Sequence, residues 1–345
     1  MVGAQSALGS PMTLAWLLVQ FAVCALLIAR SGYVLSRSAD ALADAHGWGR
    51  GWVGLALLAT VTSLPELASG ISAVTFVDAP NLAVGNALGA CVVNLLFLVV
   101  VDALQRQQPM YREASSTHLL SAGFGVVMLG FITLSLLTGP RAPAVLHVGI
   151  YSPILLALYL LALKGVHAYE RQASAPLAQL HTPASAKATR SEWRRFGLGA
   201  LVVLVAGSWL PEVADELGQL LGLSRSFVGT VMLAVVTTLP EMAVTLGALR
   251  IGALDMAIGN LLGSNLFNVA ILAVDDAFYI RGPLLADAAS VHAGTAVTAL
   301  VMTGLVIIGL VMRPQGRTLR VLSWISVCLV ATYVLNVALV YLSGM

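Results

Sequence analysis

Apolar residues fill this chain in long runs, and polar residues gather in the short stretches between them. Ten of the runs are about twenty residues long, the length of helix that crosses the hydrocarbon core of a bilayer. We therefore predict an all-α polytopic membrane protein whose ten transmembrane helices cover roughly 12–35, 52–76, 81–104, 117–138, 144–163, 196–219, 226–249, 254–277, 290–312 and 319–342.

The stretch between the fifth and sixth runs differs from the rest. Residues 164–195 are rich in Ala, Ser, Thr, Pro and charge, a composition typical of a flexible linker without a core of its own. This linker divides the chain into a first five-helix repeat, 1–163, and a second, 196–345.

Composition agrees with a membrane protein. Of the 345 residues, 59% are hydrophobic and 10% charged, whereas a soluble domain has roughly 25% charged residues. A net charge of +2 is too small to indicate a nucleic-acid partner. The three cysteines lie inside apolar runs without metal-type spacing, so we predict packing roles for Cys24, Cys91 and Cys328.

Lysine and arginine set the orientation, because cytoplasmic loops of membrane proteins carry an excess of both. With the N-terminus outside, 15 of the 18 basic residues fall on the inner side and 3 on the outer side. We expect both termini outside and the 164–195 linker in the cytoplasm. No basic segment precedes the first run, so we interpret that run as a true span. With 16 Arg against 2 Lys, a compact core and no targeting segment, we expect a prokaryotic plasma (inner) membrane.

The two halves of the chain repeat each other. Residues 60–73 align with 235–248 at a shift of 175, and 81–104 align with 255–278 at a shift of 174. Each half holds five spans, an odd number, so the second half is inverted relative to the first. Inverted repeats with interrupted helices and a site near the midplane are typical of secondary transporters.

One motif, Thr-(Ser/Thr)-Leu-Pro-Glu, occurs in each repeat at 62–66 and 237–241. A carboxylate at bilayer depth is costly and usually marks an ion or substrate path. Proline removes one backbone donor and frees a carbonyl oxygen in the preceding turn. Together with the hydroxyls of Thr62, Ser63, Thr237 and Thr238, these oxygens suit a hard cation such as Ca²⁺ or Na⁺. A salt bridge or a protonated packing carboxyl is the alternative for Glu66 and Glu241.

Other polar residues leave alternatives open. The hydroxyls can bond to their own helix carbonyls, and Asn94 and Asn268 can join helices instead of facing an ion. Asn81 and Asp255 are expected to cap their own helices. Three aspartates at helix ends are either interfacial charges or an acidic vestibule: Asp102, Asp275 and Asp276. We expect His118 and His292 to be interfacial.

With these motifs in place, the chain resembles the sodium/calcium exchanger family of the calcium/cation antiporter superfamily. The signature is the paired repeat in which Thr-Ser-Leu-Pro-Glu precedes Gly-Asn-x-x-Gly-Ser-Asn-x-x-Asn, and residues 237–241 and 259–268 match it almost fully. The resemblance implies ten spans, outward termini and four cation sites between the repeats. It also implies metal-ligand roles for Ala59, Thr62, Ser63, Glu66, Asn94, Ala234, Thr237, Thr238, Glu241, Ser264 and Asn268.

Two departures from the family pattern affect the expected chemistry. Ala90 stands where the first repeat would supply a hydroxyl, and Asn94 and Asn268 stand where one repeat often has an aspartate. Only Glu66 and Glu241 then remain as acidic ligands. Two negative charges balance one Ca²⁺ or two monovalent ions, so exchange is expected to be closer to electroneutral than in members with three acidic ligands.

We therefore expect an antiporter, not an enzyme, that exchanges Ca²⁺ for Na⁺ by alternating access and needs no cofactor. A proton-coupled exchanger for calcium or another divalent cation is the main alternative, and a passive channel or a non-transporting sensor are others. The short linker predicts no regulatory calcium-binding domain. The sequence leaves the coupling ion and the oligomeric state open.

Overall fold

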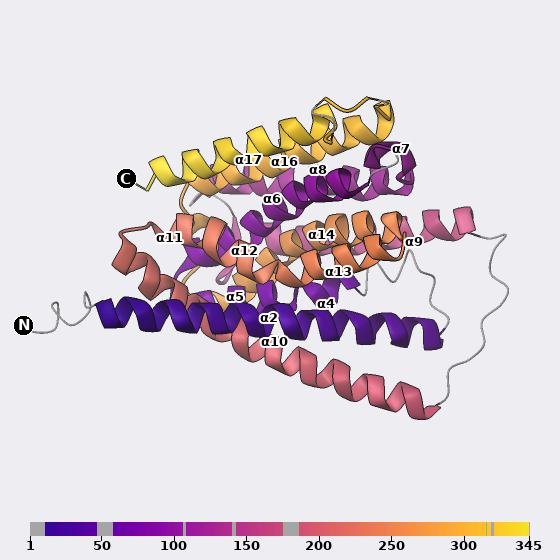
Figure 1. Cartoon of the computed structure of the whole chain (residues 1–345). Coiled ribbons are helices and arrows are strands. Elements are labelled where there is room, and N and C mark those ends of the chain that lie inside the picture. The colour runs from indigo at the N-terminus through magenta and orange to yellow at the C-terminus, as the bar shows by residue number, and fades with distance from the viewer. Residues whose placement is uncertain are drawn as a thin grey trace, which may run out of the picture.

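The computed structural model describes residues 11–46, 58–105, 108–139, 143–174, 186–314, 316–318 and 321–344. These residues are almost entirely helical (Figure 1). Within this described part, eight helices are long and apolar enough to cross a membrane. They are α2 (Pro11–His46), α6 (Pro80–Leu104), α8 (Thr117–Thr138), α9 (Tyr151–Ser174), α10 (Ala186–Leu221), α14 (Leu254–Phe278), α16 (Val291–Met312) and α17 (Trp324–Leu342).

A ninth span is broken in the middle. It comprises α11 (Arg225–Phe227), the π-helix η3 (Val228–Leu233), α12 (Ala234–Thr237) and α13 (Leu239–Arg250), with a bend of 40° at the break. Its counterpart in the first repeat is α4 (Ala59–Thr62) followed by α5 (Leu64–Thr75). The start of this predicted span, 52–57, lies outside the described residues, so the count of ten stays a prediction.

The helix boundaries differ from the predicted spans mainly where polar residues continue a helix. α10 begins at Ala186 and α9 continues to Ser174, so both described ends of the 164–195 segment are helical. Residues 175–185 lie outside the described part. The fifth span was predicted to begin at 144, but the hairpin of β1 (Ala144–Val145) and β2 (Val148–Gly149) occupies this stretch.

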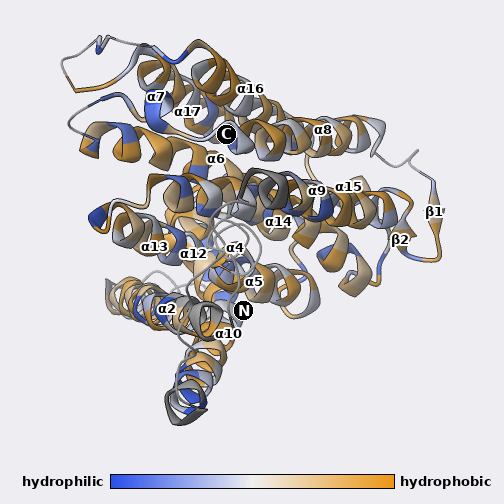
Figure 2. Cartoon of the chain, turned by 90° about the vertical axis from the view of Figure 1, so that its right-hand side faces the viewer, coloured by the Kyte–Doolittle hydropathy of each residue, from blue (hydrophilic) through white to orange (hydrophobic). Residues whose placement is uncertain are grey.

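Two helices form the centre of the molecule. The most apolar window of α14 is 89% buried within the protein and that of α6 is 72% buried, against 17% for α2. α6 and α14 pack on each other, and the broken helices lie against them. Seen along the helices in Figure 2, α2 and α10 lie together beside this bundle, and α8 and α16 lie on its opposite side.

Two aspartates tie the repeats to each other. Asp102, near the end of α6, accepts hydrogen bonds from Met110 N, Ser323 N and Ser326 Oγ at 2.7–3.1 Å. These partners include the start of α17, which belongs to the second half of the chain. Asp102 is fully buried, so it is neither an interfacial charge nor part of a vestibule, and that expectation is wrong.

Asp276 mirrors this arrangement at the other end of the molecule. It accepts four hydrogen bonds, from Leu284 N, Tyr151 Oη, Gly149 N and Ser152 Oγ, at 2.5–2.8 Å. Three of these donors precede or begin α9 in the first half. The backbone donors at a helix start have no partner within the helix, and here each repeat supplies the acceptor for the other. The short helices α7 (Met110–Glu113) and α15 (Leu284–Asp287) are held by the same two carboxylates.

The polar residues at the other ends of α6 and α14 also bond across the repeats. Asn81 Oδ1 accepts from Ala289 N, and Asp255 Oδ1 accepts from Ser115 N and contacts His118 Nε2 at 3.0 Å. The sequence predicted that each would cap its own helix, and this prediction is wrong. His118 and its repeat mate His292 are buried, so the interfacial placement is also wrong.

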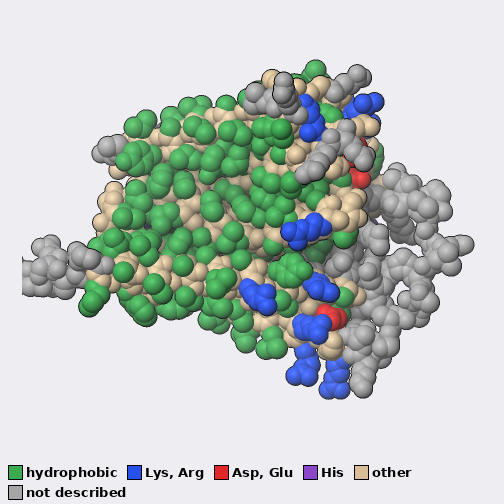
Figure 3. Space-filling model, in the orientation of Figure 1, with side chains coloured by type: hydrophobic (Ala, Val, Ile, Leu, Met, Phe, Trp, Pro, Cys, Tyr) green, Lys and Arg blue, Asp and Glu red, His purple; other side chains and the backbone are tan. Residues whose placement is uncertain are grey.

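The surface matches a membrane protein. On the face shown in Figure 3, hydrophobic side chains cover a broad band, and the Lys, Arg, Asp and Glu side chains gather toward one end. That end contains the last turn of α13 and the first turns of α10 (Figure 1).

Candidate cation site between the repeats

Both broken helices change direction at the residue that the motif predicts. Ser63 separates α4 from α5 with φ −87° and ψ 13°, and Thr238 separates α12 from α13 with φ −80° and ψ 1°. The proline follows two residues later, in the first turn of the second helix, where its missing N–H is tolerated. The interruption is therefore built identically in the two repeats.

The two glutamates follow these breaks and are fully buried. Ser63 Oγ donates to Glu241 Oε1 at 2.7 Å, which joins the break of the first repeat to the carboxylate of the second. Ser63 comes three residues before Glu66, about one helical turn, so this bond brings Glu241 to the turn that carries Glu66. Both oxygens of Glu66 and Oε2 of Glu241 have no hydrogen-bond partner in the structure.

Hydroxyl and carbonyl oxygens lie around these carboxylates. Thr62 Oγ1 lies 3.4 Å from Ser264 Oγ, and Ser264 Oγ lies 3.5 Å from the carbonyl oxygen of Ala59. Thr62 precedes Ser63, whose hydroxyl donates to Glu241, so this group of oxygens lies beside that carboxylate. The structure thus brings five predicted ligands from both repeats to one place: Ala59, Thr62, Ser63, Glu241 and Ser264.

Some hydroxyls do make the local bonds that the sequence left open. The single hydrogen of Thr237 Oγ1 can go to Asn86 Oδ1 at 3.0 Å or to the carbonyl of Leu233, one turn earlier in the broken span, at 3.1 Å. Thr238 Oγ1 donates to the carbonyl of Ala234 at 2.8 Å, whereas its repeat mate Ser63 reaches across to a glutamate. We call the two glutamates and the hydroxyl and carbonyl oxygens around them the cage. The cage is therefore asymmetric, because the two repeats surround their glutamates differently.

The two asparagines at the middle of α6 and α14 are both fully buried. Asn94 Nδ2 donates to Asn265 Oδ1 at 3.1 Å, but Asn94 Oδ1 has no partner. Neither polar atom of Asn268 has one. Asn94 thus joins helices and still offers an oxygen, so the two interpretations of this residue are compatible.

The sequence did not predict the π-helix η3 ahead of the second break. η3 ends at Leu233, and its repeat mate Leu58, the first described residue before α4, has the same conformation. Gly85 and Gly89 of α6 let η3 approach: an added Cβ at Gly85 would lie 2.9 Å from Thr230 N. Single π-turns occur often at functional sites. Glycines four residues apart let helices approach closely, so this pair was the signal available in the sequence.

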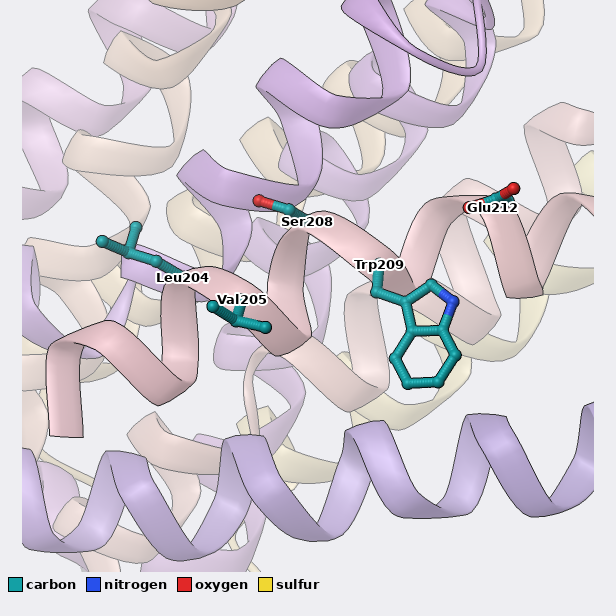
Figure 4. A pocket seen from close by; sticks show the side chains of 5 residues that line it. All are labelled: Leu204, Val205, Ser208, Trp209 and Glu212. Atoms are coloured by element: carbon teal, nitrogen blue, oxygen red, sulfur yellow. The ribbon is translucent and has the colours of Figure 1, made fainter. Parts of the chain in front are cut away.

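Elsewhere on the described residues, one hollow is a further candidate for a binding site. A shallow hollow is lined by Leu204, Val205, Ser208, Trp209 and Glu212, all from α10 (Figure 4). It has no contribution from the broken helices. Within the described ranges, no group of three His, Cys, Asp or Glu side chains is placed to hold a metal.

Mirrored carboxylates at helix breaks in an apolar bundle define a class, the membrane cation transporters built from inverted repeats. The family model described as sodium/calcium exchanger protein matches residues 16–164 and 192–342. The chain belongs to this family. It is an integral membrane protein and a cation antiporter, not an enzyme.

Individual relatives agree with this assignment. The proposed antiporter CaxA of Alkalimonas amylolytica is 30% identical over 250 residues, which cover 69% of this chain and 72% of the relative. The inner membrane protein YrbG of Escherichia coli (strain K12) is 27% identical, covering 64% of this chain and 66% of its own length. A solved structure of the sodium-calcium exchanger NCX_Mj shares the fold, with TM-score 0.62 and 18% identity over 94% of this chain and 99% of that chain.

Proposed function

We propose that this protein exchanges Ca²⁺ for Na⁺ across the membrane by alternating access, with the ions held between Glu66 and Glu241. The observation that carries the proposal is the state of these two carboxylates: both are fully buried, and three of their four oxygens have no hydrogen-bond partner. No ion pair to either is found in the part of the chain that the structure describes. A buried charge without a partner is costly, and a bound cation would supply that partner.

The proposed ligands combine the residues of both repeats. Carbonyl oxygens would come from Ala59 and Ala234, and amide oxygens from Asn94 and Asn268. Hydroxyls and carboxylates would come from Thr62, Ser63, Glu66, Thr237, Thr238, Glu241 and Ser264. All of these side chains or backbone positions are buried to 1% exposure or less, and hard oxygen ligands of this kind suit Ca²⁺ and Na⁺.

Movement of α2 and α10 across the broken helices would switch access. Gly32 of α2 lies against the ring of Pro240, and Gly207 of α10 lies against Pro65 and Ala68. Each glycine thus meets the proline of the opposite repeat. The absence of a side chain at these crossings would let the helix pair slide over the breaks.

Two carboxylates would balance one Ca²⁺ or two Na⁺, so we expect exchange to be nearly electroneutral. We also propose a prokaryotic inner membrane with both termini outside, supported by the distribution of Lys and Arg and by the inner-membrane name of the Escherichia coli relative. Ions are the expected partners, without a resident cofactor or a regulatory calcium-binding domain.

Uptake of labelled calcium into proteoliposomes tests the proposal. Vesicles are loaded with Na⁺, K⁺ or no alkali cation, and each is measured at equal pH and with a pH gradient. Uptake that needs internal Na⁺ supports the proposal. Uptake that ignores Na⁺ and K⁺ and follows the pH gradient would replace it by proton coupling.

Proton coupling is the second candidate because of one observation. Ala90, fully buried, offers no hydroxyl where its repeat mate Ser264 contacts Thr62. A cage with one oxygen fewer is less suited to a full set of Na⁺ sites. Glu66, whose two oxygens are unpartnered, would then carry the proton.

A further inference from the structure

A third carboxylate lies inside the bundle, outside the cage described above. Asp275 of α14 is fully buried, and neither of its oxygens has a hydrogen-bond partner. No ion pair to it is present among the described residues. A buried carboxylate in this state is as costly as those of the two glutamates.

Its neighbour Asp276 shows that the fold can satisfy a buried acid at this depth. Asp276 accepts four hydrogen bonds from backbone and hydroxyl donors. Asp275, one residue earlier, points to a different side of the helix and accepts none. The scaffold role therefore belongs to Asp276 and does not explain Asp275.

The carboxylate of Asp275 lies against α5, the helix that carries Glu66. A Cβ added to Gly70 would overlap the Asp275 carboxylate, so only glycine leaves room for it there. The adjacent Ser69 is 1% exposed, and its hydroxyl also has no partner. A buried, unpartnered hydroxyl thus comes one residue before the glycine that the unpartnered carboxylate contacts.

These groups continue the row of polar atoms that begins in the cage. Ser69 and Gly70 lie three and four residues beyond Glu66, on the same face of α5. Asp275 lies seven residues beyond Asn268, two turns along the same face of α14 and about 10 Å further. The row leads from the cage toward the end of the molecule where α2 begins and α17 ends (Figure 1).

The mirrored position in the other repeat carries no such row. The repeat mate of Asp275 is Val101, and that of Ser69 is Val244. Thr245, the mate of Gly70, already accepts a hydrogen bond from Asn260 at 3.3 Å. The third acid is therefore an addition on one side of the cage.

We propose that Asp275, with Ser69, forms an accessory site for a hard cation, Na⁺ or Ca²⁺, that lies between the central cage and the end of the protein bearing its termini. A carboxylate and a hydroxyl are suitable oxygen ligands for either ion. The site rests on the proposed function only in that the protein transports these ions. An ion that enters from the end bearing the termini would bind at this accessory site before it reaches the cage, whereas the opposite end has no such site.

Ion binding by the purified full-length protein tests the site. Equilibrium dialysis with labelled Ca²⁺ alone, and separately with labelled Na⁺ alone, counts bound ions in the wild type, Asp275→Asn, Glu241→Gln and Asp255→Asn. Asp255 is the matched control because it is on the same helix and its side chain is 59% exposed. A thermal unfolding scan of each variant shows that it is folded.

The expected result is the loss of one bound ion in Asp275→Asn for at least one of the two cations, with the central ion retained. Glu241→Gln should lose the central ion and keep the accessory one, and Asp255→Asn should match the wild type. As a milder second variant, Ser69→Ala should weaken the accessory site about two- to tenfold.

Equal ion counts in Asp275→Asn and the wild type for both cations would overturn the accessory site and identify Asp275 as a protonated packing residue. If instead Glu241→Gln bound as many ions as the wild type while Asp275→Asn lost one, the central site would be wrong and the accessory one would stand. Should Asp275→Asn not fold, unchanged binding in Ser69→Ala would contradict the proposal.

Discussion

The two repeats keep the same cage and differ on the path that leads to it. Both have a helix break, a proline and a buried glutamate, and both use an aspartate to hold the start of a helix in the other half. Beyond the cage, one side has Asp275 against Gly70 and the other has Val101 and Thr245. The two repeats thus share the helix breaks, the glutamates and the aspartates that hold the fold, and they differ in the residues between the cage and each end of the protein.

The largest effect is expected from removing either glutamate. Glu66→Gln and Glu241→Gln each take away one of two charges that face the ion, and breaking a buried charge pair costs about 3–5 kcal/mol. Calcium uptake into proteoliposomes should fall at least about hundredfold in both variants. Normal uptake in one of them would show that the mirrored acids are not equivalent in function.

A large effect on folding is expected at the mirrored aspartates. Asp102→Ala leaves three donors without an acceptor, and Asp276→Ala leaves four. Hydrogen bonds to a charged group contribute about 1.5–3 kcal/mol each, so both variants should unfold at clearly lower temperature. Asp276→Ala should be the less stable of the two, with Glu216→Ala, which replaces an exposed carboxylate of α10, as control. An unchanged unfolding temperature would show that the repeats are not held together in this way.

A smaller effect is expected at the glycines that meet the prolines. An added methyl at Gly32 would overlap the Pro240 ring, whereas at Gly207 it would lie 3.1 Å from Ala68 Cβ. Gly32→Ala should therefore slow exchange more than Gly207→Ala, by about tenfold if one conformation is strained by 1.4 kcal/mol. Ion binding should be retained. Gly247→Ala is the control, because a Cβ there meets nothing within 4 Å.

The smallest effect tests the asymmetry of the cage itself. Ala90→Ser would give the first repeat the hydroxyl that Ser264 gives the second. It should lower the Na⁺ concentration for half-maximal exchange about two- to tenfold, whereas Ser264→Ala should raise it. No change in either variant would remove this position from the ligand set.

The sequence predicted the features that local patterns control. The proline and glutamate predicted both helix breaks, and apolar runs placed α6, α8 and α14 within one residue of their ends. Helices that extend into polar sequence, such as α10 from Ala186, were missed because a hydropathy run reports contact with lipid and not the end of a helix.

Contacts between the repeats were not predictable from the sequence alone. Asp102 and Asp276 looked like interfacial charges because they lie at helix ends, and only the packing shows donors from the other half around them. Asp275 and Asp276 are consecutive aspartates, so the local sequence does not distinguish them. The different environment of Asp275 follows from which face of α14 it occupies and from Gly70 on another helix.

The central claim is that two mirrored glutamates supply the whole charge of the exchange site. It is tested most directly by measuring labelled Na⁺ efflux and labelled Ca²⁺ uptake together in proteoliposomes whose membrane potential is clamped. The account predicts two Na⁺ for each Ca²⁺ and a flux that does not change with voltage. Three or more Na⁺ for each Ca²⁺, with a strongly voltage-dependent flux, would contradict it.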